Sequence, residues 1–159
     1  MLPVFMMRII SQNIKKGSIK VADNIIASSD YGLALFVGFT HGDTELIVDQ
    51  MAQKVMNMRI FPDIEGKTNL SISDVNGSLL VIPNFTLYGS LKKARRPSFT
   101  DALNHHIAAS LYVRFVAQLH KTNITTACGI FGAAMEITLV NDGPFTMIID
   151  SRDLPGATL

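Results

Sequence analysis

The sequence predicts a single α+β domain in which a mostly antiparallel sheet packs against two main helices. Short runs rich in β-branched and aromatic residues alternate with turn-forming residues through most of the chain. Two longer segments instead carry apolar residues at helical spacing. The length of 159 residues suits one domain with a sizeable core, and the sequence contains no repeat, low-complexity tract or linker. We therefore expect one continuous domain.

The first part of the chain is expected to form short strands. Residues 8–15, 18–22 and 24–28 are strand-like, and Gly17 and Asp23 are expected to interrupt them. These strands would begin the antiparallel part of the sheet.

The next segment predicts a buried strand followed by a helix. The apolar run 33–39 is typical of a strand that is buried on both faces. Asp43 is expected to cap a helix that ends near Met58. Four apolar residues fall on one face of that helix and are expected to pack in the core: Ile47, Met51, Val55 and Met58.

The second half predicts further strands around a second helix. Strands are expected at 70–73 and 78–87, and a helix from Thr100 or Asp101 to Lys121. The apolar face of this helix comprises Ala108, Leu111, Tyr112, Phe115 and Leu119. Two strands, 137–140 and 145–149, are expected to close the domain.

Composition limits the classes of function. Only 17% of residues are charged, which favours a surface that is partly covered by another subunit. The net charge of +1 excludes a globally basic nucleic-acid-binding protein. Cys128 is the single cysteine, compatible with a reducing cytosol. No signal peptide and no apolar run long enough to span a membrane is recognised, so we expect a cytoplasmic protein with no membrane contact.

The segment 141–146, Asn-Asp-Gly-Pro-Phe-Thr, admits two interpretations. Periodicity alone predicts an ordinary hairpin loop between the last two strands. However, a Gly143–Pro144 bond can adopt the cis form at a cost of only about 0.5–1 kcal/mol. A cis bond would point two successive carbonyl oxygens the same way, as a rigid acceptor for a ligand.

A second group of motifs adds a resemblance to a known family. Asn84–Leu87 (Asn-Phe-Thr-Leu) is followed by the basic segment 95–99, by 129–135 (Gly-Ile-Phe-Gly-Ala-Ala-Met) and by 141–146. Residues 59–63 and 65–67 add matches after the first helix. In this order and spacing the chain resembles the D-aminoacyl-tRNA deacylase family over about residues 7–150. Residues 1–6 are then an N-terminal extension and 151–159 a C-terminal tail.

The resemblance implies a homodimeric hydrolase with a twisted, barrel-like sheet. Its substrate would be the ester that joins a D-amino acid, or glycine, to tRNA, so that it would serve translation proofreading. Gly143 and Pro144 would reach, with a cis bond, into the partner subunit's pocket, hold the substrate amine and leave no room for an L side chain. Phe131 and Asn141 are further candidates to bind substrate. Neither cofactor nor metal is expected, because the four histidines and one cysteine lack ligand spacing.

The segment Asn84, Phe85 and Thr86 is the candidate catalytic wall. Thr86 as a covalent nucleophile would need an adjacent base, and none is near in sequence. We favour backbone N–H groups of residues 84–86, with the Thr86 hydroxyl, as the groups that position water and stabilise the oxyanion. The ribose 2′-hydroxyl of the tRNA would assist.

The only concentrated positive patch consists of Lys92, Lys93, Arg95 and Arg96. From charge alone it is an ordinary solvated loop. Beside the catalytic wall it would contact phosphates of the tRNA acceptor stem without reading bases.

Departures from the family pattern keep alternatives open. The family usually has Ser-Gln at the positions of Pro83 and Asn84, and Arg at the position of Asn13. A related branch with Pro at the first of these positions clears L-alanyl-tRNA, so altered chiral specificity is one alternative. An inactive tRNA-binding relative is another. A thiol hydrolase that pairs Cys128 with His105, His106 or His120 is a third.

Overall fold

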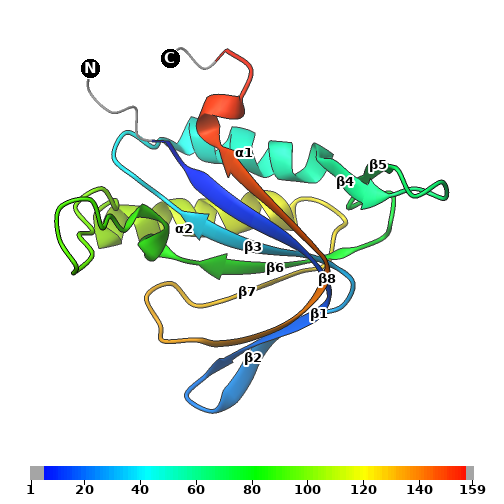
Figure 1. The fold of residues 1–159 in the computed structure, drawn as a ribbon, viewed down its shortest axis with the longest axis horizontal. Helices are drawn as coiled ribbons and strands as arrows, with labels where there is room; N and C mark the ends of the chain where they lie inside the picture. Colours follow the sequence, from blue (N-terminus) through cyan, green and yellow to red (C-terminus); the bar gives the residue numbers. More distant parts are fainter. Residues whose placement is uncertain (1–5, 157–159) are drawn as a thin grey trace.

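The computed structural model describes residues 6–156 as one α+β domain (Figure 1). The expected N-terminal extension 1–6, apart from Met6, and positions 157–159 of the expected tail lie outside the described residues. The elements, in chain order, are β1 (Arg8–Val21), β2 (Asn24–Ser29), β3 (Gly32–Gly38), α1 (Glu45–Asn57), β4 (Arg59–Pro62), β5 (Thr68–Ser71), β6 (Ser78–Pro83), η1 (Phe85–Tyr88), α2 (His105–His120), β7 (Thr126–Cys128), β8 (Glu136–Asp150) and η2 (Ser151–Asp153).

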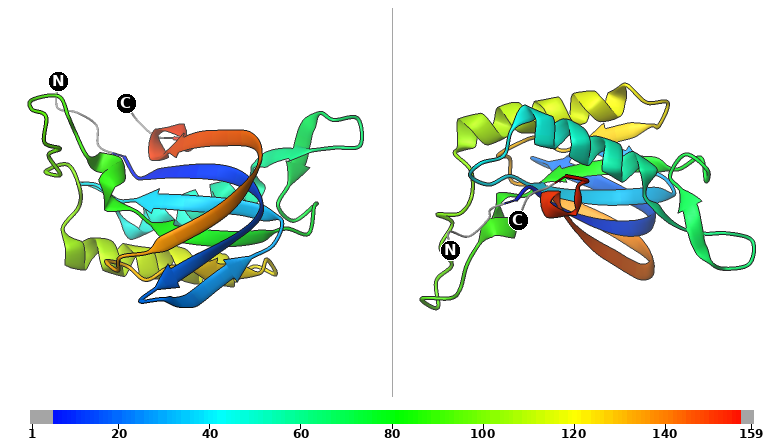
Figure 2. Two further views of the ribbon diagram at one scale, coloured as in Figure 1. Left: turned by 60° about the horizontal axis from the view of Figure 1, so that its bottom comes forward. Right: turned by 90° about the horizontal axis from the view of Figure 1, so that it is seen from above.

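One mixed sheet carries most of the strands. Its order is β2-β1-β3-β6-β7, and β8 pairs along the other edge of β1. The pairings of β1 with β2, β3 and β8 are antiparallel, as expected, whereas β6 pairs in parallel with both β3 and β7. The sheet curls strongly, so that β8 sweeps across it in the view of Figure 2. A separate antiparallel hairpin, β4 and β5, projects from one end.

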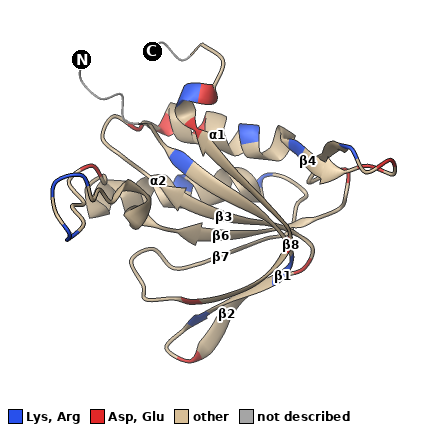
Figure 3. Ribbon diagram, in the orientation of Figure 1, with Lys and Arg blue, Asp and Glu red and all other residues tan. Residues whose placement is uncertain are grey.

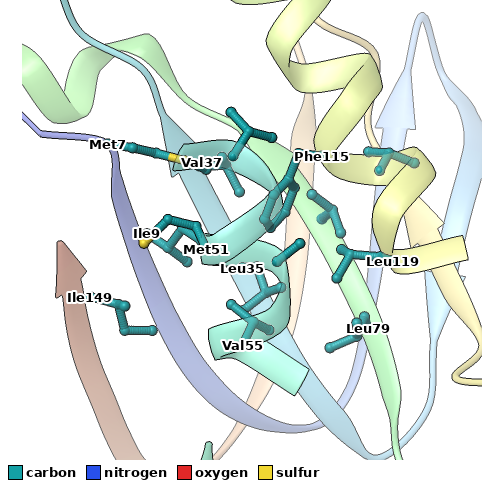
Figure 4. Close-up of a cluster of buried hydrophobic side chains, with 14 of the residues drawn as sticks. Met7, Ile9, Leu35, Val37, Met51, Val55, Leu79, Phe115, Leu119 and Ile149 are labelled. Carbon is teal, nitrogen blue, oxygen red and sulfur yellow. The ribbon is translucent and has the colours of Figure 1, made fainter. Parts of the chain in front are cut away.

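Both α-helices cover the same face of this sheet (Figure 2). The expected core faces are confirmed: Met51 and Val55 of α1 and Phe115 of α2 are fully buried between the helices and the strands. Figure 4 shows these side chains meeting Leu35 of β3. Deleting such a buried ring by a Phe→Ala change typically costs about 3–5 kcal/mol. The core therefore fixes the helices on the sheet, and with them the segments that precede each helix.

Two predicted boundaries in the first half are wrong. Gly17 does not interrupt a strand, because β1 continues through it, paired with Ser29 on one side and Leu139 on the other. A Cβ on Gly17 would lie 2.8 Å from the Leu139 side chain, so the glycine permits close packing there. The cap of α1 is Thr44, whose hydroxyl accepts the Ile47 N–H.

Asp43, which was the predicted cap, has another role. Its Oδ2 atom accepts the Thr40 N–H at 2.8 Å and so closes the turn before α1. The Oδ1 atom is buried. Burial raises the pKa of this carboxyl to about 6. Asp43 therefore stabilises the turn rather than the helix end.

Boundaries around β6 and α2 also differ from prediction. The strand predicted to reach Leu87 ends at Pro83, and a 3-10 turn, η1, follows. The second helix begins at His105 rather than near Thr100, because Asn104 provides the cap by accepting the His106 N–H at 3.0 Å. The segment before it is held differently: the Leu103 N–H donates to the Phe39 carbonyl at 3.1 Å.

The hairpin predicted at 141–144 is wrong. β8 is one strand of 15 residues whose two halves both pair with the long β1. Asn141 is opposite Ile14 and Thr146 is opposite Gln12, so four residues of β8 oppose the single residue Asn13. The segment 142–145 is thus a large bulge in a continuing strand.

The end of the described chain returns to the core. η2 follows β8 directly, and Leu154 is buried in the main hydrophobic cluster. Arg8 at the start of β1 donates through Nε to the Asp150 carboxylate at 2.8 Å. No helix in the described part of the chain is long and apolar enough to cross a membrane.

Candidate functional site

The catalytic-wall segment is held tightly against the end of β3. The Asn84 N–H donates to the Val37 carbonyl at 2.8 Å. A Cβ at Gly38 would lie 3.1 Å from Asn84 O and 3.1 Å from the Tyr88 ring, so the glycine permits η1 to pack this closely. Arg8 lies over the Tyr88 ring at 5.7 Å, which links η1 to β1 as well. This support gives the segment a defined position.

A cavity of about 510 Å³ opens beside this segment. Two of the sequence motifs meet there, because Pro83, Asn84 and Phe85 from one and Phe131 from the other all line the cavity. The remaining lining residues are Phe36, Ile82, Leu103, His105, Gly132, Ala133, Met135 and Ile137. Asn84 and His105 are the two polar side chains within this lining. Such an apolar cavity with few polar groups is the usual form of a small-ligand site.

Hydrogen bonds within the catalytic wall decide which groups can face a ligand. The Thr86 N–H donates to Asn84 Oδ1 at 3.2 Å, and the Thr86 hydroxyl donates to the same oxygen. The Asn84 N–H already donates to the Val37 carbonyl. Phe85 is the first residue of η1, so its N–H has no acceptor within the turn. Of the three backbone N–H groups expected to act as donors, only that of Phe85 has no acceptor among the described residues.

Thr86 itself is exposed and does not line the cavity. The acceptor of its hydroxyl proton is an amide oxygen, which is not a base of useful strength. Asn84 therefore orients the hydroxyl without activating it, and the arrangement supplies no general base for nucleophilic attack by Thr86.

His105 is the functional candidate that the sequence interpretation missed at this site. Its ring packs edge-on against Phe131, with centroids 5.1 Å apart and planes inclined by 62°. A Cβ on Gly132, whose φ is +80°, would lie 2.9 Å from the imidazole Cε1. The sequence signal is a histidine early in the second helix, after the basic segment, but the sequence alone suggests only a pairing with Cys128.

Gly143 and Pro144 are not among the residues that line this cavity. They lie in the bulge of β8, exposed, and their peptide bond is cis. Asn141 is exposed and also absent from the lining. Within one chain, the structure therefore does not bring these three candidates together with Asn84 and Phe131.

Asn13, one of the departures noted in the sequence, is buried in β1. Its side chain is 4% exposed and donates from Nδ2 to the Ile60 carbonyl at 3.0 Å. The Oδ1 atom has no hydrogen-bond partner among the described residues. Asn13 thus ties β1 to β4 while lying opposite the bulge in register.

The four cations of the basic segment lie on a projecting loop. Lys92, Lys93, Arg95 and Arg96 are exposed, and within residues 6–156 none of them forms a salt bridge. Figure 3 shows their positive charge gathered at one end of the molecule, next to η1 and the start of α2. We call residues 92–96 the basic loop.

Metal and thiol chemistry find no support in the described residues. No group of three or more His, Cys, Asp or Glu side chains is placed to hold a metal ion there. Cys128 does not line the cavity, and no hydrogen bond joins it to a histidine among residues 6–156. His120 lies instead near the Thr126 carbonyl, at 3.4 Å.

Comparison with known proteins identifies relatives over nearly the whole chain. The family model described as D-Tyr-tRNA(Tyr) deacylase matches residues 10–150. A D-aminoacyl-tRNA deacylase of Chloroflexus aurantiacus is 45% identical over 148 residues, which cover 93% of this chain and 92% of that protein. The enzyme of the same name from Desulfotalea psychrophila is 42% identical, over 93% of this chain and 99% of its own.

Solved structures share the fold. A c-Myc DNA unwinding element binding protein superposes with a TM-score of 0.81 at 30% identity, over 89% of this chain and 97% of its own. A probable eukaryotic D-amino acid tRNA deacylase gives the same TM-score at 16% identity, over 91% and 99% of the two chains. The second likeness is one of fold alone.

Proposed function

Because this chain belongs to the D-Tyr-tRNA(Tyr) deacylase family, we propose that it hydrolyses the ester between a D-amino acid and the 3′ end of tRNA. It is an enzyme of the hydrolase class, like the relatives named above. The observation that carries the proposal is the cavity that Asn84, Phe85 and Phe131 line together. Two motifs separated by more than forty residues thereby form one apolar site.

The catalytic wall acts by position rather than by a covalent intermediate. The Phe85 N–H donates to the developing oxyanion, and Asn84 holds Thr86 in place. An aminoacyl ester is already activated, so fixing the ester beside a water molecule supplies a large part of the rate. The ribose 2′-hydroxyl of the substrate, which is adjacent to the ester, assists the attack of this water.

Chiral selection comes from a second copy of the chain. In a homodimer, the exposed Gly143–Pro144 bulge of one subunit enters the cavity of the other, accepts the substrate ammonium and excludes an L side chain. Glycine has no side chain to exclude, so glycyl-tRNA is hydrolysed too. The proposal is supported by the absence of this bulge from its own cavity lining.

Exposed apolar side chains on β2 and β8 support the dimer: Ile25, Ile26, Val140, Met147 and Ile148. A surface with few charges and a group of this kind is typical of a protein interface. The basic loop then contacts phosphates of the bound tRNA. Such contacts do not depend on base identity, which suits an enzyme that serves many tRNAs. The role that we propose is proofreading in the cytoplasm.

The test compares deacylation of D-tyrosyl, L-tyrosyl, L-alanyl and glycyl tRNA by the purified protein. We expect rapid loss of the D-tyrosyl and glycyl esters, with both L esters spared. Loss of the L-alanyl ester would instead mean altered chiral specificity, as in the branch with Pro at the position of Pro83. Hydrolysis of none, with tRNA binding retained, would indicate an inactive tRNA-binding relative.

A further inference from the structure

The ring pair Phe85–Phe99 forms an exposed aromatic surface at the mouth of the cavity. The two ring centroids are 5.1 Å apart and the planes are inclined by 63°. Phe85 lines the cavity, yet it remains 55% exposed, and Phe99 remains 38% exposed. Two large aromatic side chains in contact, both open to solvent, are the form of a binding surface rather than of a core.

Backbone contacts hold Phe99 in this position. Ser90 and Ser98 exchange two N–H···O bonds of 2.8 Å, which closes the loop immediately before Phe99. The Phe99 carbonyl accepts the Ala102 N–H at 3.1 Å. A Cβ on Gly89 would lie 3.0 Å from the Phe99 ring, so the glycine makes room for it. The ring is therefore pre-positioned, which lowers the entropy cost of binding.

The basic loop projects from the same closure. Residues 92–96 lie between Ser90 and Ser98, and their four cations form no salt bridge among residues 6–156. Cavity, aromatic pair and cationic loop are thus continuous through Phe85 and Phe99. Aromatic side chains that stack bases, next to cations that follow the backbone, are how proteins bind single-stranded nucleic acid.

We propose that Phe99, with Phe85, stacks on the base that precedes the terminal nucleotide of a single-stranded RNA 3′ end, and that the phosphates of this end run along the basic loop. That the RNA is a tRNA rests on the function proposed above. The unpaired cations favour a polyanion over an apolar peptide, since a peptide would leave their charge unmatched. Every base offers a π-face, so this contact does not depend on sequence.

The test measures binding without hydrolysis. The probes are two fluorescently labelled, unacylated RNA oligonucleotides ending in CCA: one intact, one with an abasic nucleotide in place of the penultimate base. Anisotropy titrations give both dissociation constants for the wild type. We expect the intact RNA to bind about 10-fold more tightly, the usual worth of a stacked base. Equal dissociation constants would overturn the proposal without the use of any variant.

Three variants locate the contact. Phe99→Ala should abolish the difference between the two RNAs, and Phe99→Trp should preserve it. Leu91→Ala is the matched control, because Leu91 is exposed in the same segment but is not part of the ring pair; it should keep the difference. If Phe99→Ala still preferred the intact RNA 10-fold, the stacking surface would lie elsewhere. A protein that showed the preference but cleaved no ester would contradict the proposed hydrolysis and leave this inference standing.

Discussion

The His105 imidazole packs edge-on against the Phe131 ring, with 5.1 Å between the centroids. This contact joins the first turn of α2 to the segment that precedes β8, and both residues line the cavity. Gly132 makes it possible, because any Cβ there would approach the imidazole to 2.9 Å. The cavity wall therefore depends on a glycine as well as on the two rings.

Gly132→Ala should lower both stability and activity. A φ of +80° is unfavourable for alanine, and the new methyl group would displace His105. We expect the free energy of unfolding to fall by about 1 kcal/mol or more, or about 2–4 °C in melting temperature. His105→Ala should remove the clash with the new methyl group, so the double variant should recover the part of the stability loss that the clash causes. A double-mutant cycle measures that part. If Gly132→Ala kept the wild-type melting temperature and kcat/KM, the close approach of residue 132 to His105 would matter for neither stability nor activity.

Thr86→Ala should reduce deacylation only in part. The hydroxyl donates its proton to an amide oxygen, so it orients the wall but is not activated for attack. We expect kcat/KM for D-tyrosyl-tRNA to fall by less than about 100-fold, because the loss of a donor that contacts the oxyanion directly costs about 10²–10³-fold. Thr86→Ser keeps the hydroxyl and should retain most activity. A complete loss in Thr86→Ala, with tRNA binding intact, would favour a covalent role.

The helix and buried-strand patterns predicted much of the fold because each is a local property. The helical spacing of Met51 and Val55 holds in any tertiary context, and their burial is confirmed. Helix starts were less predictable, since Asp43 and Thr44 are both good caps. The choice depends on the Thr40 N–H, which donates to Asp43, and the position of Thr40 is fixed by a long-range bridge to Ala102.

Long-range pairing explains the largest error. The two halves of β8 have the sequence propensity of two strands joined by a turn. The local sequence does not distinguish a hairpin from a bulge in one continuous strand. The outcome depends on β1, which is long enough to pair with both halves. The site shows the same division: Asn84 and Phe131 belong to sequence motifs, whereas the place of His105 in the site depends on its long-range packing against Phe131.

Asp43→Asn should change the pH dependence of stability. Burial raises the pKa of Asp43 to about 6, whereas the unfolded chain titrates near 3.9. The folded state therefore binds the proton more tightly, and the stability that this contributes is present below about pH 4 and lost as pH rises through about 6. Asparagine abolishes that loss.

Urea unfolding measures this effect. Relative to wild type, the free energy of unfolding of Asp43→Asn should be larger, meaning a more stable fold, by about 2–3 kcal/mol at neutral pH than at about pH 4. Asp49→Asn is the control of opposite sign, because a hydrogen bond from Arg114 lowers the pKa of Asp49. A difference between Asp43→Asn and wild type that stays constant with pH would show that Asp43 does not titrate in this range.

Ile148→Glu should dissociate the proposed homodimer. Ile148 is 62% exposed on β8, beside Met147, and a buried carboxylate at an apolar interface is strongly unfavourable. Sedimentation velocity should show a monomer where the wild type is a dimer, with deacylation reduced in parallel because each cavity lacks its partner bulge. Ile148→Val should remain dimeric. A dimeric, active Ile148→Glu protein would place the interface on another surface.

Gly143→Ala should impair the bulge of β8 and with it the selection between D and L esters. At a φ of +148°, a Cβ would lie 2.5 Å from the Phe145 backbone nitrogen, so the backbone must move to accept alanine. In the proposed dimer this displaces the group that faces the substrate amine. We expect a fall of at least about 10-fold in kcat/KM for D-tyrosyl-tRNA, the effect of misplacing a positioning group.

Gly66→Ala is the control, because Gly66 also has a positive φ, +79°, but open space around its Cβ position. This variant should lose stability without a change in the ratio of D to L hydrolysis. If Gly143→Ala kept the wild-type rate and ratio, this bulge would not be the chiral filter.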